Sequence, residues 1–397
     1  MKRQIVAAMA IATMASACCS NPKNPTQMAQ NKLDSLFTER YAVVTEDGKT
    51  TFPNPGGTVI IKKGDTILFE KAYGIADINT KEPIDSNTFF NIASVSKQFT
   101  AVAILKLQAE GKIDIDKSIY DVAPGVNKYL PKAEKPFTDI TVKQLMSHSS
   151  GIKDTRPRES REFCLTATDM ESLEYMKGIT ELGFTPGTEY EYINPTFQIL
   201  YVMIQELSGK SFEQYMREEI FNPAGMEQSI YFEKDRVIPN MSHGYMPTDE
   251  SAKEEDKVFE EFDYGEETFF ATKADGGLYT SINEFVKWEE ALAENKIIPQ
   301  ELKELAYSEI TKVSGSTYCD YQNRPYTSYG CGWFMESKPN MPKKVYHTGD
   351  NGGYQIYAAK YPHNGLTITV FENRHDHKRW PMAEKLDAIA AEAGWLE

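Results

Sequence analysis

The segment from about Ser94 to Glu110 constrains the fold more than any other part of the chain. Its apolar residues are spread around most of the circumference of a helix: Phe99, Val102, Ile104, Leu105 and Leu107. A helix with this pattern must be buried on nearly every side, so the rest of the chain has to surround it. Gly111 ends the predicted helix.

Strand-like segments occur at both ends of the chain, whereas helical segments fill the middle. Val59–Ile61 and Thr66–Ala72 flank Lys62-Lys63-Gly64-Asp65, which predicts a hairpin. Later strands are predicted at Gly332–Met335, Gln355–Lys360 and Thr367–Glu372. Further helices are predicted at Val142–Met146, Pro195–Leu207, Phe212–Ile220, Ile282–Ala293 and Pro381–Ala393. The simplest architecture is an α/β (α+β) fold in which both chain ends build one sheet and a helical lobe is inserted between its halves. A cleft between sheet and lobe is the expected place for a ligand.

The N-terminus has the pattern of an export signal. Lys2 and Arg3 precede an apolar run from Ile5 to Met14, which is too short to span a bilayer. Ala15-Ser16-Ala17 before Cys18 resembles the lipobox of bacterial lipoproteins, with Ala15 where leucine is usual. An ordinary secretory signal cut near Ala17 is the alternative.

This pattern divides the chain into three predicted parts. Residues 1–17 are interpreted as a signal peptide and 18–30 as a polar tether, which a lipid on Cys18 attaches to the membrane. Residues 31–397 are interpreted as one folded domain. We therefore expect an exported protein of the cell envelope, held at a membrane (the outer membrane is favoured).

Charge excludes one class of partner. Without Lys2 and Arg3 the 43 basic residues become 41, which with 58 acidic residues gives a formal charge of −17. So acidic a chain is a poor partner for nucleic acid, because binding there requires neutralising phosphates. The acidic stretch from Asp249 to Glu267 is interpreted as a solvated insertion. Cys319 and Cys331 could pair in an oxidising envelope, which the sequence leaves open.

Ser94 and Lys97 open the buried helix three residues apart. Residues at this spacing share one face, and the free N–H groups of a first turn favour negative charge. A buried lysine has a lowered pKa and can take the proton of a serine hydroxyl. The alternative is a helix-capping serine beside a lysine, but that leaves Lys97 unexplained inside an apolar helix.

Two further stretches carry candidate site residues. Tyr192-Ile193-Asn194 lies in a loop before a helix, where a phenol could relay a proton and an amide could hold a substrate carbonyl. His347-Thr348-Gly349 precedes Gly352-Gly353, and its small residues would let a substrate lie along a strand edge. The backbone N–H of Asp350 would then join that of Ser94 in an oxyanion hole. Ordinary turns are the alternative interpretation of both stretches.

Other chemistries find little support in the sequence. No serine stands in Gly-x-Ser-x-Gly, which counts against an α/β-hydrolase. His375-Asp376-His377 is interpreted as a polar turn rather than as metal ligands, because no further ligand cluster stands near in sequence. His148 is interpreted as structural.

Taken together, these stretches resemble the β-lactamase-related serine hydrolases. That family includes class C β-lactamases, D-alanyl-D-alanine carboxypeptidases, D-aminopeptidases and some esterases. The similar segments, in order, are Tyr73–Asp77, Phe90–Lys97, Ile140–Gly151, Pro223–Met226, Gly276–Tyr279 and Tyr329–Trp333.

The resemblance implies an antiparallel sheet flanked by helices and a site without metal or organic cofactor. It implies that Ser94 is the nucleophile, that Lys97 and Tyr192 share the proton transfers, and that Asn194 orients the substrate. His347, Thr348 and Gly349 would line an edge strand, and water would take the acyl group. The expected partner is therefore a small-molecule or peptide substrate.

His347 departs from class C β-lactamases, which carry lysine there. Histidine is mostly neutral near pH 7 and gives a substrate carboxylate little charge. We therefore expect peptide, amide or ester substrates rather than efficient β-lactam hydrolysis. Arg324 and Arg374 are candidates for the missing charge, and Asp350 would add repulsion if it faced the cleft. A surface lipoprotein that binds ligands without turnover is the remaining alternative.

Overall fold

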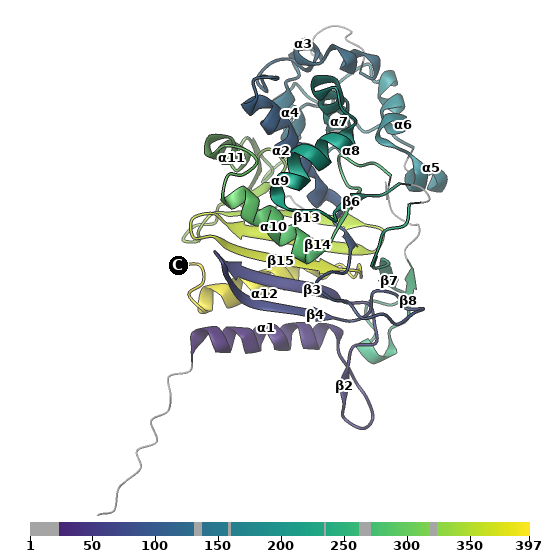
Figure 1. The fold of residues 1–397 in the computed structure, drawn as a ribbon, viewed down its shortest axis with the longest axis vertical. Helices are drawn as coiled ribbons and strands as arrows, with labels where there is room; N and C mark the ends of the chain where they lie inside the picture. The colour runs from purple at the N-terminus through teal and green to yellow at the C-terminus, as the bar shows by residue number, and fades with distance from the viewer. Residues whose placement is uncertain (1–23, 131–136, 158–159, 234–235, 262–270, 318–323) are drawn as a thin grey trace, which may run out of the picture.

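An eight-stranded antiparallel sheet forms the middle of the molecule, with a helical lobe on one side of it (Figure 1). The computed structural model describes residues 24–130, 137–157, 160–233, 236–261, 271–317 and 324–397. In sheet order the strands are β10 (Thr311–Lys312), β11 (Thr327–Tyr329), β12 (Phe334–Glu336), β13 (Lys344–Asn351), β14 (Tyr354–Tyr361), β15 (Leu366–Glu372), β3 (Gly57–Lys63) and β4 (Thr66–Tyr73). N-terminal and C-terminal strands meet where β15 pairs with β3, so the predicted architecture is confirmed.

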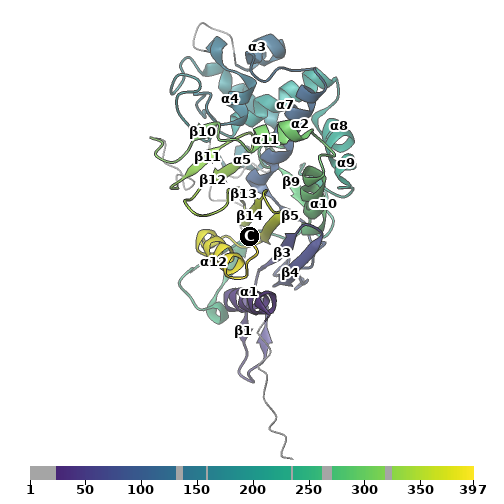
Figure 2. The same cartoon turned by 90° about the vertical axis from the view of Figure 1, so that its left-hand side faces the viewer.

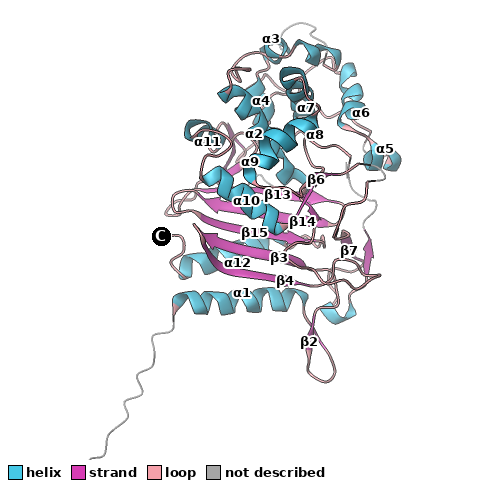
Figure 3. Cartoon of the chain, viewed as in Figure 1, coloured by secondary structure: helices cyan, strands magenta, loops and turns pink. Residues whose placement is uncertain are grey.

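Helices from residues 96–224 build the lobe, and helices before and after that stretch lie around the sheet (Figure 3). The lobe contains α2 (Ser96–Ala109), α3 (Ile119–Val122), α4 (Val142–Met146), α5 (Arg161–Thr166), α6 (Asp169–Glu174), α7 (Pro195–Ser208), α8 (Phe212–Tyr215) and α9 (Asn222–Ala224). Around the sheet lie α1 (Pro25–Tyr41), α10 (Ile282–Ala293), α11 (Gln300–Ala306) and α12 (Arg379–Glu392). The predicted bounds of α4 and α10 are confirmed.

Short strands lie outside the large sheet. They form three small antiparallel sheets: β1 (Val43–Val44) with β2 (Thr50–Thr51), β9 (Leu278–Thr280) between β5 (Phe90–Asn91) and β6 (Ile230–Tyr231), and β7 (Tyr245–Pro247) with β8 (Phe259–Glu261). No helix in the described ranges is long and apolar enough to cross a bilayer.

The two faces of the large sheet pack against different helices (Figure 2). Successive side chains of a strand point to opposite faces. On β3, Val59 and Ile61 join a core with residues of α1 and α12, whereas Ile60 joins the core of α2 and α10. This alternation buries apolar side chains on both faces, so the sheet is the central layer.

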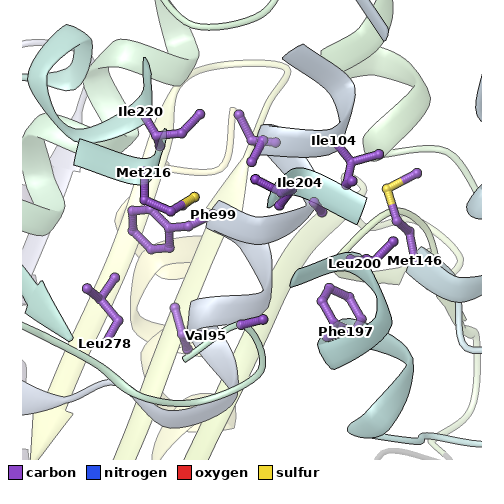
Figure 4. Close-up of a cluster of buried hydrophobic side chains, with 14 of the residues drawn as sticks. Val95, Phe99, Ile104, Met146, Phe197, Leu200, Ile204, Met216, Ile220 and Leu278 are labelled. Carbon is purple, nitrogen blue, oxygen red and sulfur yellow. The ribbon is translucent and has the colours of Figure 1, made fainter. Parts of the chain in front are cut away.

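The predicted central helix is buried as its pattern requires. Phe99 stacks on Trp288 of α10 with 4.1 Å between ring centres, and Val95, Phe99 and Ile104 lie in one apolar cluster with residues of α7 (Figure 4). Its start differs from the prediction, because Ser94 lies in a 3-10 turn, η1 (Ala93–Val95), and α2 begins at Ser96.

Helix α1 begins inside the predicted tether. Asn24 caps it by accepting a hydrogen bond from the N–H of Thr26, and Pro25 occupies its first turn. Ala29 is buried against the sheet, so residues 25–30 belong to the folded part rather than to a polar linker. The predicted signal peptide and Cys18 lie outside the described residues.

Candidate active site

Ser94 stands at a sharp turn between β5 and the central helix. The residue before it, Ala93, has φ of +47°, a left-handed conformation that costs a residue other than glycine about 1–2 kcal/mol. The Asn91 side chain holds this turn by accepting a hydrogen bond from the Ala93 N–H at 2.7 Å. Ala93 and Val95 are buried, whereas Ser94 is partly exposed. The turn therefore presents one hydroxyl to solvent from a rigid support.

Lys97 lies beneath this hydroxyl. Its Nζ is 3.0 Å from Ser94 Oγ and donates a hydrogen bond to the Asp275 carbonyl oxygen at 2.8 Å. Burial lowers the pKa of the amine to about 7; Asp275 opposes this shift and the Arg156 guanidinium adds to it. An amine with this pKa is partly unprotonated at neutral pH, so it can accept the Ser94 proton.

The loop before α7 brings Tyr192 to the same lysine. Lys97 Nζ lies 4.9 Å from the centre of the Tyr192 ring, within the range of a cation–π contact. Asn194 directly precedes α7, and its Oδ1 is buried without a hydrogen-bond partner among the described residues. That oxygen is available to accept a hydrogen bond from a substrate N–H.

His148 belongs to this site although its sequence pattern did not reveal it. Its ring centre lies 4.2 Å from that of Tyr192, and its Nδ1 accepts a hydrogen bond from the Ile193 N–H at 3.2 Å. Burial lowers the pKa of its imidazole well below the usual value, and Lys97 adds to this effect. A neutral ring that holds the Tyr192 loop matches the structural role expected of it.

His347, Thr348 and Gly349 lie inside strand β13, next to the turn that carries Ser94. A Cβ on Gly349 would stand 2.4 Å from the Ile92 carbonyl oxygen, so only glycine allows this approach. The expected edge strand is corrected, because β13 lies between β12 and β14. Strand β12 is short, however, and pairs only with residues 344–346. In the described part of the chain no strand pairs with residues 347–351 on that side.

Two hydrogen bonds fix the side chain of His347. The Thr348 carbonyl, 2.7 Å away, can only accept, so Nδ1 carries the ring proton. Nε2 then accepts a hydrogen bond from the Tyr329 hydroxyl at 2.9 Å. Burial, with Lys97 nearby, lowers the pKa of His347 to about 3. The imidazole is therefore neutral at physiological pH and offers no positive charge.

The negative charge of the Asp350 side chain is paired with a cation of helix α12. Its carboxylate contacts the Arg379 guanidinium of α12 and lies 3.2 Å from His375 Nε2. Burial opposes ionisation, but Arg379 outweighs it and holds the pKa of this carboxyl well below its usual range. The repulsion expected from a free carboxylate is thus offset by Arg379.

Neither arginine proposed as a source of charge is unpaired. Arg374 is buried and lies 2.8 Å from Glu254, and Arg324 lies 2.8 Å from Glu384. Arg156, which the sequence did not single out, is the arginine whose charge reaches Lys97. It is itself held by Asp154 through two hydrogen bonds of 2.9 and 2.7 Å.

The His375-Asp376-His377 turn contacts charged side chains of other segments. Asp376 lies 2.8 Å from Arg40, and His377 lies 3.5 Å from Glu250. Among the residues placed by the structure, no three His, Cys, Asp or Glu side chains are grouped as metal ligands. Cys331 is buried, while its candidate partner Cys319 lies outside the described residues.

The chain is similar in sequence and in fold to known proteins. The family model described as Beta-lactamase matches residues 46–392. Penicillin-binding protein 4* of Bacillus subtilis is 25% identical over 82% of this chain and 70% of its own length. A D-aminopeptidase of Gluconobacter oxydans is 27% identical over 86% of this chain, which spans only 60% of that enzyme. The octameric penicillin-binding protein homologue of Pyrococcus abyssi has a similar fold, with a TM-score of 0.70, 24% identity, and coverage of 93% of this chain and 77% of its own.

Proposed function

The chain belongs to the β-lactamase family of serine hydrolases, and from this premise we propose that it hydrolyses amide, peptide or ester bonds through an acyl-enzyme on Ser94. The observation that carries the proposal is the 3.0 Å contact between Ser94 Oγ and Lys97 Nζ. It places a partly exposed hydroxyl beside a buried amine of lowered pKa. Such an amine can act as the general base that takes the proton of a serine and makes its oxygen nucleophilic.

Acylation proceeds in two proton-coupled steps. Ser94 gives its proton to Lys97, directly or through Tyr192, and its Oγ bonds to the substrate carbonyl carbon. The backbone N–H groups of Ser94 and Asp350 stabilise the negative oxygen of the tetrahedral intermediate. The carbon–leaving group bond then breaks, and the leaving group takes the proton back from the Lys97–Tyr192 pair.

Deacylation repeats these steps with water as the nucleophile. A water molecule loses its proton to the same pair and attacks the acyl carbon, and the released Ser94 oxygen recovers a proton. Asn194 holds the substrate amide through its unpartnered oxygen. No metal or organic cofactor enters this sequence of steps.

Charge favours substrates without a carboxylate next to the scissile bond. His347 is neutral and hydrogen-bonded on both ring nitrogens, whereas Arg324, Arg374 and Arg379 face carboxylates. Among these described side chains a substrate carboxylate would therefore be desolvated without a charge partner, which is costly. An aminopeptidase-like, amidase-like or esterase-like activity fits this environment better than carboxypeptidase or β-lactamase activity.

A substrate panel tests this proposal. D-amino acid amides and peptides, p-nitrophenyl esters and a chromogenic cephalosporin are assayed with the wild-type enzyme and with Ser94→Ala. We expect turnover of an amide or ester that Ser94→Ala abolishes. Cephalosporin turnover as the dominant activity would instead favour the β-lactamase alternative. No turnover and no adduct on Ser94 would favour the ligand-binding lipoprotein.

We also propose that the chain is exported and carries a lipid on Cys18. The support is the sequence pattern from Lys2 to Cys18 alone. Labelling with a fatty-acid analogue in a bacterial host tests it. Label on the wild type but not on Cys18→Ser is the expected result, and an unlabelled wild type cut near Ala17 would support ordinary secretion.

A further inference from the structure

A three-residue segment, Lys273–Asp275, binds the amine of Lys97 and the helix that carries it through backbone carbonyl groups. The Asp275 carbonyl accepts the hydrogen bond from Lys97 Nζ at 2.8 Å, and the Ala274 carbonyl accepts one from Thr100 Oγ1 at 2.7 Å. Lys97 and Thr100 stand one turn apart on α2, so two successive carbonyls of the segment are bound to the catalytic helix. The place of Lys97 Nζ beneath Ser94 therefore depends on where this segment lies.

Asp169, the first residue of α6, holds the other side of the same segment. Its Oδ2 accepts a hydrogen bond from the Lys273 N–H at 2.7 Å, and its Oδ1 accepts one from the Ala274 N–H at 3.2 Å. Helix α6 does not need this carboxylate as a cap, because Thr168 and Glu171 form a complete capping box. The Lys273 side chain also faces elsewhere, towards Glu233 at 2.6 Å.

Keeping a carboxylate in this place is unfavourable. Asp169 is only 1% exposed. Burial raises the pKa of its carboxyl to about 7, and the nearby Asp275 contributes. The backbone hydrogen bonds and the charge of Lys273 oppose this shift, but no described cation forms an ion pair with Asp169. A buried acid in this state is expensive unless its hydrogen bonds perform a task. The task visible here is the clamping of two backbone N–H groups next to the lysine.

Asp275 adds a charge to this support. Its side chain is buried, and its Oδ1 lies 3.4 Å from Gln198 Nε2 of α7. Its negative charge favours the protonated amine of Lys97, opposed by burial and by Arg156. Besides Ser94 Oγ, the Tyr192 ring and the neutral imidazoles of His148 and His347 also face Lys97 among the described residues.

We propose that Asp169 is a positioning residue for Lys97, acting through the backbone of Lys273–Asp275. The inference rests on the proposed role of Lys97 as the base for Ser94. Replacing the carboxylate by an amide leaves one acceptor and sets an N–H₂ group against a backbone N–H. The segment then shifts, and with it the amine, and a displacement near 1 Å lowers catalytic rates by roughly 100-fold.

The test is the pH dependence of phosphonylation by an uncharged fluorophosphonate, a reaction that needs no knowledge of the substrate. We expect Asp169→Asn to lower the plateau rate by roughly 10- to 100-fold. Glu284→Gln is the matched control, because Glu284 is also a buried acid in a first helical turn that accepts two backbone N–H groups, at 2.9 and 3.3 Å. It lies outside the site, so its folded variant should react at the wild-type rate.

A second variant reports on the charge. Asp275→Asn should move the acid limb of the profile to lower pH by roughly 0.5–1 unit, because Lys97 then loses its proton more easily. An unmoved limb would show that the charge of Asp275 does not act on Lys97. If Asp169→Asn does not fold, Thr100→Val decides, because it removes the hydrogen bond that joins the catalytic helix to the Ala274 carbonyl: a wild-type plateau rate in this variant would overturn the proposal. A folded Asp169→Asn protein with the wild-type plateau, or an equal loss in Glu284→Gln, would overturn it too. Absence of any wild-type reaction at Ser94 would instead overturn the proposed function, on which this inference depends.

Discussion

The hydroxyl of Tyr329 donates a hydrogen bond to Nε2 of His347 across 2.9 Å, so the imidazole has no free nitrogen. The position where class C β-lactamases carry a lysine is therefore occupied by a neutral ring locked to the sheet. Because burial lowers the pKa of His347 to about 3, no pH between 5 and 9 makes it a cation.

Substrates that differ only by a terminal carboxylate provide the first prediction. A D-amino acid peptide ending in an amide should be cleaved with a kcat/KM on the order of ten-fold higher than the same peptide ending in a free acid, since His347 is neutral and Arg324, Arg374 and Arg379 are already paired with carboxylates. Steady-state kinetics at pH 6 and 8 measures this. A clear preference for the free acid would show that the site holds a cation that our account lacks.

The lowered pKa of Lys97 predicts the pH profile of the enzyme. Below about pH 7 the amine keeps its proton and cannot accept that of Ser94. Hydrolysis of a neutral p-nitrophenyl ester should therefore rise about ten-fold per pH unit below 7 and level off above it. Neither His148 nor His347 can produce this limb, because burial keeps the pKa of each well below the ordinary histidine value. A rate that is flat from pH 5.5 to 8 would contradict the assignment of Lys97 as base.

The same burial predicts that Lys97 destabilises the fold. Its folded pKa, about 7, lies below the usual 10.5, so between these values the unfolded chain binds more protons and wild-type stability rises with pH. Lys97→Met should raise the free energy of unfolding at pH 7 by about 1–3 kcal/mol while abolishing activity. Urea denaturation at pH 7 and 9.5 measures this, and the advantage of the methionine variant should shrink at the higher pH. An unchanged or less stable methionine variant at pH 7 would argue against a costly buried amine.

Gly349 lets strand β13 pack closely against the turn that carries Ser94. In Gly349→Ala the new Cβ must push the Ile92 carbonyl away, which displaces the turn of Ser94. We expect a loss of about 1–3 kcal/mol in stability and a fall in acylation rate. Gly178→Ala is the control, since a Cβ there meets nothing within 4 Å. Thermal denaturation and fluorophosphonate labelling of both variants measure the difference, and equal behaviour would contradict the close approach.

Local patterns predicted much of the fold. Helices α4 and α10 have their predicted bounds, and Thr141 and Ser281 cap their N-terminal ends. The hairpin of β3 and β4 follows from its turn residues. By contrast, Asn24 and Pro25 are local signals for the start of α1, but the burial of Ala29 against the sheet, which makes this stretch part of the fold rather than a tether, depends on residues distant in sequence.

The candidate site was only partly visible in the sequence. Ser94, Lys97 and Tyr192 carry reactive groups in recognisable stretches, and the structure brings them together. His148 and Asp169 act on these residues through packing and backbone hydrogen bonds with distant segments, and their own surroundings in sequence look ordinary. The sequence also placed His347 on an edge strand, whereas β13 lies inside the sheet. Only the sheet order reveals that β12 pairs with residues 344–346 and leaves residues 347–351 without a partner strand on that side among the described residues.

Peptide mapping by mass spectrometry after treatment with a fluorophosphonate tests the central claim most directly. Our account predicts one covalent adduct per chain, located on Ser94, formed above pH 7 and absent from Ser94→Ala and Lys97→Met. A folded wild-type protein that stays unmodified, or that carries its adduct on another residue, would contradict it.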